Sequence, residues 1–89
     1  MKIPNKLDIL GCEYKIIQQD DLGDAGQCWL GKQIIIIEKR QHPDQKELTL
    51  LHEIIEALNA QLELELPHKT ICALETGLYQ VLKKNRLSR

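Results

Sequence analysis

The sequence lacks a strong charge of either sign and any long hydrophobic run. Lysine and arginine total 12 against 13 aspartates and glutamates, for a net charge of −1. Electrostatics therefore do not favour nucleic acid or an anionic membrane as the main partner. The longest apolar runs are four residues long, far below the roughly 20 residues that cross a bilayer. We expect a protein or peptide partner, with no nucleic acid and no membrane involved.

Cysteine is also scarce, and its spacing is uninformative for disulfides. The three thiols, Cys12, Cys28 and Cys72, are odd in number and none forms a Cys-x-x-Cys pair, so they do not predict a disulfide framework. Reduced thiols favour a cytoplasmic protein, and the first ten residues lack the apolar run of a secretory signal. A length of 89 residues predicts a single domain over residues 1–89, small enough for a metal ion or a partner to add useful stability.

The chain divides into a strand half, about residues 6–39, and a helical half, about 43–85. In the first half, Gly11 predicts one hairpin, and Gly31 with Lys32 predicts a second. The four isoleucines from Ile34 to Ile37 are a continuous β-branched run, typical of a strand covered by a helix.

Two helices are predicted after the strands. The first runs from about Asp44 to Gln61, with Glu47 three residues after Asp44 as in a capping box. Pro67 can open the second helix, which continues to about Lys84 with Asn85 as its C-terminal cap. The predicted fold is α+β: a small antiparallel sheet of three to four strands followed by two packed helices.

Each helix is expected to have an apolar stripe with a polar strip beside it, when residues are placed about 100° apart. On the first helix, His52 and Glu56 flank the apolar stripe. The apolar stripe of the first helix contains Leu48, Leu51, Ile54, Ile55, Leu58 and Leu62. The apolar stripe of the second contains Ile71, Leu74, Leu78, Val81 and Leu82. The polar strip of the second contains His68, Cys72, Glu75 and Tyr79.

The segment His52-Glu53-Ile54-Ile55-Glu56 is one residue away from the zinc-protease signature His-Glu-x-x-His. Two ligands four residues apart on a helix converge on one point, which suits tetrahedral zinc. His52 and Glu56 would then be ligands, and Glu53 would be the general base that takes a proton from zinc-bound water. An ordinary charged helix would show the same five residues.

The third ligand would come from the polar strip of the second helix. His68 is favoured, because with His52 and Glu56 it completes a set of two histidines and one carboxylate, an accepted catalytic zinc shell. Glu75 and Cys72 are the alternatives, and Cys72 could also serve as a fourth ligand of a closed structural site. Tyr79 is a candidate hydrogen-bond donor to a developing oxyanion.

Two longer segments, "TLLHEIIEALN" and "LPHKTICALETGLYQVLKKN", carry a family resemblance. The chain resembles small phage and prophage proteins with a zincin-like, minimal metallopeptidase fold. Their helix has Leu-Leu-His-Glu after a threonine, and their second helix ends in Gly-Leu-Tyr-Gln-Val-Leu, as at residues 77–82. An isoleucine-rich strand precedes both. The resemblance covers about the last two-thirds of the chain.

The resemblance implies a zinc-dependent hydrolase, a peptidase acting on a protein target, in which an extended substrate pairs with the sheet edge. It makes His52 a ligand and Glu53 the base. Glu56 departs from the pattern, because many relatives carry histidine there. Either His68 supplies the missing imidazole, or the domain has lost catalysis and binds a protein partner.

Overall fold

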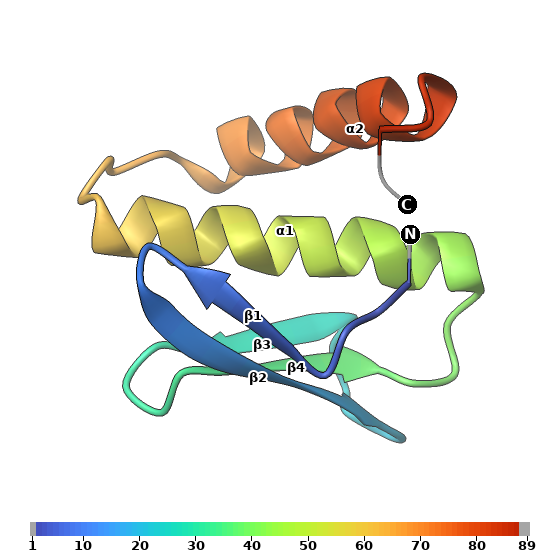
Figure 1. The fold of residues 1–89 in the computed structure, drawn as a ribbon, viewed down its shortest axis with the longest axis horizontal. Helices are drawn as coiled ribbons and strands as arrows, with labels where there is room; N and C mark the ends of the chain where they lie inside the picture. The colour runs from blue at the N-terminus through green and yellow to red at the C-terminus, as the bar shows by residue number, and fades with distance from the viewer. Residues whose placement is uncertain (1, 88–89) are drawn as a thin grey trace.

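The structure is a computed structural model that describes residues 2–87. Four strands precede two helices along the chain (Figure 1). The elements are β1 Lys6–Ile9, β2 Cys12–Gln19, β3 Gly26–Trp29, β4 Ile34–Glu38, α1 Pro43–Gln61 and α2 His68–Lys84. The predicted α+β class, with a small sheet followed by two packed helices, is confirmed.

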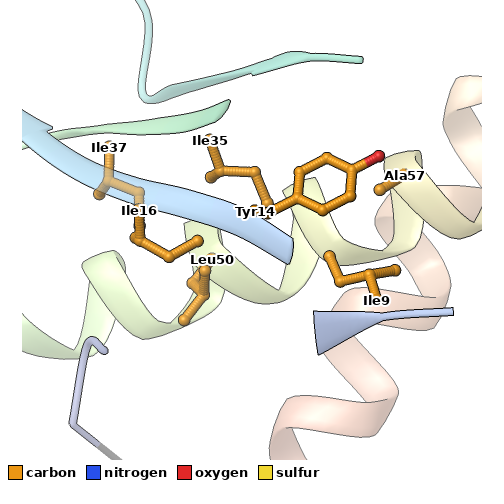
Figure 2. Close-up of a cluster of buried hydrophobic side chains, with 7 residues drawn as sticks. All are labelled: Ile9, Tyr14, Ile16, Ile35, Ile37, Leu50 and Ala57. Carbon is orange, nitrogen blue, oxygen red and sulfur yellow. The ribbon is translucent and has the colours of Figure 1, made fainter. Parts of the chain in front are cut away.

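The molecule has three layers, in the order sheet, α1 and α2 (Figure 1). Helix α1 contacts β1, β3 and β4, whereas within residues 2–87 the only element that α2 contacts is α1. Between the sheet and α1 lies an aliphatic core with one aromatic ring, that of Tyr14 (Figure 2). The buried members of this core are Ile9, Tyr14, Ile16, Ile35, Ile37, Leu50 and Ala57. The apolar side of α1 therefore packs against the sheet, and its opposite side faces α2.

The sheet is mixed, which corrects the prediction of an antiparallel sheet. Its strand order is β1-β2-β4-β3. Both predicted hairpins form, since β1 pairs with β2 and β3 with β4 in antiparallel fashion. However, β2 pairs with β4 in parallel. The continuous isoleucine run suits the central position of β4, which has a neighbour on each side, and the short β3 is displaced to the edge.

The start of α1 also differs from prediction, because Glu47 makes no capping box. His42 is the N-cap, and its side chain accepts a hydrogen bond from the Asp44 amide. Glu47 points toward α2, where it accepts hydrogen bonds from Tyr79 Oη at 2.7 Å and Lys83 Nζ at 2.9 Å. The second helix begins after Pro67 and ends at Lys84 with Asn85 as its C-cap, as predicted.

The largest departure from the expected packing lies in α2. Three of the five residues of its predicted apolar stripe face outward: Leu74, Leu78 and Val81 are 43, 44 and 45% exposed, whereas Ile71 is 1% exposed. Glu75, from the predicted polar strip, is only 8% exposed. The contact between the helices is therefore partly polar, because the side of α1 that faces α2 carries His52, a hydrogen-bond partner for Glu75.

Close packing of β3 against α1 makes a first prediction. A Cβ atom on Gly26 would lie 2.5 Å from Thr49 Cγ2 and 3.0 Å from Glu53 Oε2. We expect Gly26→Ala to destabilise the protein by about 1–3 kcal/mol through overpacking. Gly77→Ala is the matched control: nothing lies within 4 Å of its added Cβ, and it should stabilise α2 by about 0.5–1 kcal/mol. Urea unfolding measures both, and equal effects would contradict the close approach.

Candidate metal centre

Helices α1 and α2 bring the three predicted ligands together. His52 and Glu56 lie one turn apart on α1, and His68 lies in the first turn of α2. One donor atom from each of the three side chains lies within 4.8 Å of the other two. The rings of His52 and His68 meet edge to face, with centroids 5.4 Å apart. The two helices therefore hold both imidazoles close enough to share one ion.

The two ring nitrogens of His52 have different partners. Nδ1 lies 2.7 Å from Glu75 Oε1, and Nε2 lies 3.5 Å from Glu56 Oε2. If Nδ1–H donates to Glu75, the lone pair of Nε2 is directed toward Glu56. A carboxylate that orients a histidine in this way is typical of metal sites. Glu75, predicted as an alternative third ligand, thus has a geometry suited to positioning His52.

Charge around His52 is strongly negative. Burial alone would lower the pKa of His52, but the hydrogen bond and charge of Glu75, helped by Glu53 and Glu56, raise it overall. The same carboxylates that favour an imidazolium would favour a divalent cation at this place. The site therefore has the electrostatic character of a cation site.

The distance between two of these side chains and the exposure of all three are compatible with a metal ion such as zinc. Two ligands about 2.0–2.2 Å from a tetrahedral ion lie about 3.4 Å apart, close to the 3.5 Å between His52 Nε2 and Glu56 Oε2. The side chains of His52 and Glu56 are 16% and 36% exposed, and His68 is exposed. Water or a substrate can therefore reach this group of side chains.

A second group of donors involves Cys72. The side chains of His52, Cys72 and Glu75 also offer donor atoms within 4.8 Å of one another, and Cys72 Sγ lies 3.3 Å from His68 Nε2. Partial burial, followed by the charge of Glu75, raises the pKa of the Cys72 thiol. Because zinc binds the thiolate, this environment disfavours Cys72 as a ligand relative to His68.

Glu53 is a buried carboxylate beside this cluster. It is 6% exposed, and its pKa is raised to about 7, chiefly by burial and also by the charges of Glu56 and Glu75, against the opposing effect of His52. A general base works best when its pKa is near the working pH. Glu53 lines a cavity of about 330 Å³ together with His52, His68 and Glu75. It also lines a second cavity of about 270 Å³ with Cys28 and Leu30.

Tyr79, the predicted oxyanion donor, lies outside this cluster. Its hydroxyl donates to Glu47 Oε1 at 2.7 Å, and Tyr79 does not line the cavity that holds His52 and Glu53. Sequence reasoning also missed Gly26, whose missing side chain lets β3 approach Glu53. In the sequence, the only sign of this close approach is a single glycine beside a predicted strand.

Comparisons with other proteins add no further information about the site. No protein-family model, curated protein sequence or solved structure matches this chain. Among residues 2–87, no helix is long and apolar enough to cross a membrane. The side-chain geometry and the resemblance seen in the sequence are therefore the grounds for a functional proposal.

Proposed function

We propose that this protein is a zinc-dependent hydrolase of the zincin-like type found in small phage and prophage proteins, and that it cleaves peptide bonds of a protein substrate. The observation that carries the proposal is the convergence of His52, Glu56 and His68 within 4.8 Å. Glu53, with a pKa of about 7, lies on the same cavity. A positioned base beside a two-histidine, one-carboxylate set is the arrangement that hydrolysis needs.

Each side chain has a separate task in this proposal. His52, Glu56 and His68 would hold the ion, and Glu75 would keep His52 in the required tautomer. Zinc, when bound, acts as a Lewis acid that makes water a better nucleophile near neutral pH. Glu53 would take a proton from the attacking water and deliver it to the leaving amine. The burial of Glu53 keeps its pKa high enough for both transfers.

The edge strand β3 is the proposed place for the substrate backbone. It pairs with β4 on one side only, so its other edge can accept an extended peptide. The cavity containing His52 and His68 reaches Gly26 at the start of β3, and the second cavity reaches Cys28. Glu53 lines both cavities.

We also propose that the protein lies in the cytoplasm. Cys12, Cys28 and Cys72 are free thiols, and free thiols are typical of a reducing compartment.

A second candidate function is a catalytically inactive module that binds a protein partner. The exposed apolar stripe of Leu74, Leu78 and Val81 favours it, because such a surface is typical of interaction sites. Glu53→Gln separates the two functions. A binding module keeps its biological activity after this change, whereas a hydrolase loses it.

Zinc stoichiometry by native mass spectrometry tests the proposal. The unaltered chain, purified without a histidine tag, should bind one zinc ion, and His68→Ala should lose it. His42→Asn is the matched control: it removes an exposed histidine at the start of α1 while keeping a good N-cap residue, so zinc should be retained. Glu75→Gln should retain zinc with about 10–100-fold weaker affinity.

The outcomes separate the alternatives. No zinc on the unaltered chain, even with added metal, would overturn the hydrolase. Zinc retained by His68→Ala but lost in Cys72→Ala would indicate the set of His52, Cys72 and Glu75. In that case a chelator should also unfold a closed structural site.

A further inference from the structure

Three adjoining cavities follow α1 from its middle to its connection with α2 (Figure 1). The first contains His52 and Glu53, and the second adjoins it because Glu53 lines both. The third adjoins the second, because Asn59 and Ala60 line both. The three cavities together form one continuous depression, which we call the acidic groove.

The lining of the acidic groove carries negative charge in all three cavities. The chain has 12 lysines and arginines, but within residues 2–87 none of them lines any of these cavities. Even Lys69, the residue after His68, is not part of the lining. The net charge of −1 is therefore unevenly distributed over the molecule. The carboxylates that line the groove are Asp24, Glu53, Glu56, Glu63, Glu65 and Glu75.

The deepest of these carboxylates has no partner of its own. Glu53 is 6% exposed, and within residues 2–87 it accepts no hydrogen bond and makes no ion pair. A buried carboxylate without a partner is costly, and a cation that reaches it offsets part of that cost. The charges of Glu53 and Glu56 also act on Cys28, whose pKa is raised to about 11, chiefly by burial. The groove is therefore negative in its depth as well as at its exposed end.

Strand β3 sets the spacing of a peptide bound along this groove. Gly26 lines the first cavity and Cys28 the second. Two residues are the repeat of side chains on one face of a strand, about 6.6–6.8 Å. An extended peptide paired with the free edge of β3 would therefore direct alternate side chains toward α1, one to each cavity. Beyond Cys28, the next such side chain would approach Glu63 and Glu65, which are both exposed.

We propose that the acidic groove binds an extended peptide segment with lysine or arginine at alternate positions, and that this segment is the substrate. Calling the segment a substrate rests on the proposed hydrolase, whereas binding of the segment does not need zinc. A divalent ion at the candidate metal centre would cancel two of the six charges and leave the groove negative. Charge complementarity of this kind speeds association and selects basic segments over acidic ones.

Fluorescence anisotropy of the full chain in chelator tests the charge preference without catalysis. The probe is a labelled peptide of alternating threonine and lysine. It should bind at least about tenfold more tightly than a peptide of alternating threonine and glutamine, and added salt should weaken its binding. Spermine, a polycation without a peptide backbone, should compete only at a concentration at least about tenfold higher. No binding, equal binding of both peptides, or competition by spermine at the same concentration would each overturn the proposal.

The exposed end of the groove can be altered without touching the proposed ligands or base. Glu63→Gln with Glu65→Gln should weaken binding of the lysine peptide by about 3- to 30-fold and leave that of the glutamine peptide unchanged. Glu13→Gln with Asp20→Asn is the matched control, because it changes the net charge equally at two exposed positions that line none of the three cavities. The control should keep its affinity. Equal losses in both double variants would show a response to net charge alone and would contradict a groove.

The zinc-loaded chain, given both peptides together, separates this proposal from the proposed hydrolase. The lysine peptide should be cleaved with a kcat/KM at least about tenfold higher. Equal cleavage of both peptides would overturn the preference for basic segments while the hydrolase stands. Tight binding of the lysine peptide without cleavage would overturn its assignment as a substrate, and the hydrolase with it.

Discussion

Glu53→Gln is expected to stabilise the metal-free protein at pH 8 by up to about 3 kcal/mol relative to the unaltered chain. The pKa of Glu53 is raised from 4.5 to about 7 in the folded state, with burial as the leading cause. Between these two values the folded state binds more protons than the unfolded state, so stability falls as pH rises from about 4.5 to about 7. Glutamine has no charge to bury and removes this loss.

The measurement is urea unfolding of both chains from pH 4 to pH 8 in chelator. The difference in unfolding free energy should grow across the interval between about 4.5 and 7 and stay constant above it. Glu65→Gln is the matched control, because Glu65 is exposed and its replacement should change stability by less than about 0.5 kcal/mol. A difference that does not vary with pH would contradict the raised pKa of Glu53.

The same substitution should nearly abolish catalysis. Removing a general base typically costs about 10²–10⁴-fold in rate, while the proposed ligands His52, Glu56 and His68 stay in place. We therefore expect Glu53→Gln to bind zinc but to cleave its substrate about 10²–10⁴-fold more slowly than the unaltered chain. Zinc stoichiometry and peptide hydrolysis, measured on one preparation, separate loss of the base from loss of the metal.

Glu47→Gln is expected to have the opposite effect on stability. Burial alone would raise the pKa of Glu47, but hydrogen bonds from Lys83 and Tyr79 lower it from 4.5 to about 2. A depressed pKa contributes stability that is complete above about pH 4.5 and is lost as pH falls toward 2. The shift corresponds to at most about 3 kcal/mol. The Lys83 side chain is 46% exposed, so screening reduces the expected loss to about 1–2 kcal/mol at pH 7.

Unfolding of Glu47→Gln at pH 7 and at pH 2.5 measures this contribution. The variant should be less stable at pH 7 and approach the unaltered chain at pH 2.5. Tyr79→Phe removes one of the hydrogen bonds to Glu47 and should cost about 1 kcal/mol at pH 7. If Glu47→Gln were as stable as the unaltered chain at pH 7, the polar contact between α1 and α2 would not stabilise the fold.

The two carboxylates show how one helix can carry opposite electrostatic roles. Both side chains are 6% exposed, and burial raises the pKa of each. Lys83 donates to Glu47, whereas Glu56 and Glu75 add negative charge near Glu53. The structural carboxylate and the candidate base therefore differ in the charge of their neighbours.

The sequence by itself determined the order of the elements and the helix faces on which the candidate ligands lie. Glycine turns, the isoleucine run and Pro67 located the strands and helices, because these residues act on the local backbone. Helical spacing placed His52 and Glu56 on one side of α1. It also put His68 in the polar strip of the second helix, and the structure brings donor atoms of all three within 4.8 Å.

Only the tertiary structure decided what each face is packed against. The parallel pairing of β2 with β4 depends on competition between strands distant in sequence, which no local pattern records. The outward position of Leu74, Leu78 and Val81 accompanies a contact between α1 and α2 that is partly polar, in which Glu75 pairs with His52. Hydropathy ranks residues by their preference for burial, but a hydrogen-bond partner on α1 allows Glu75 to be buried together with Ile71.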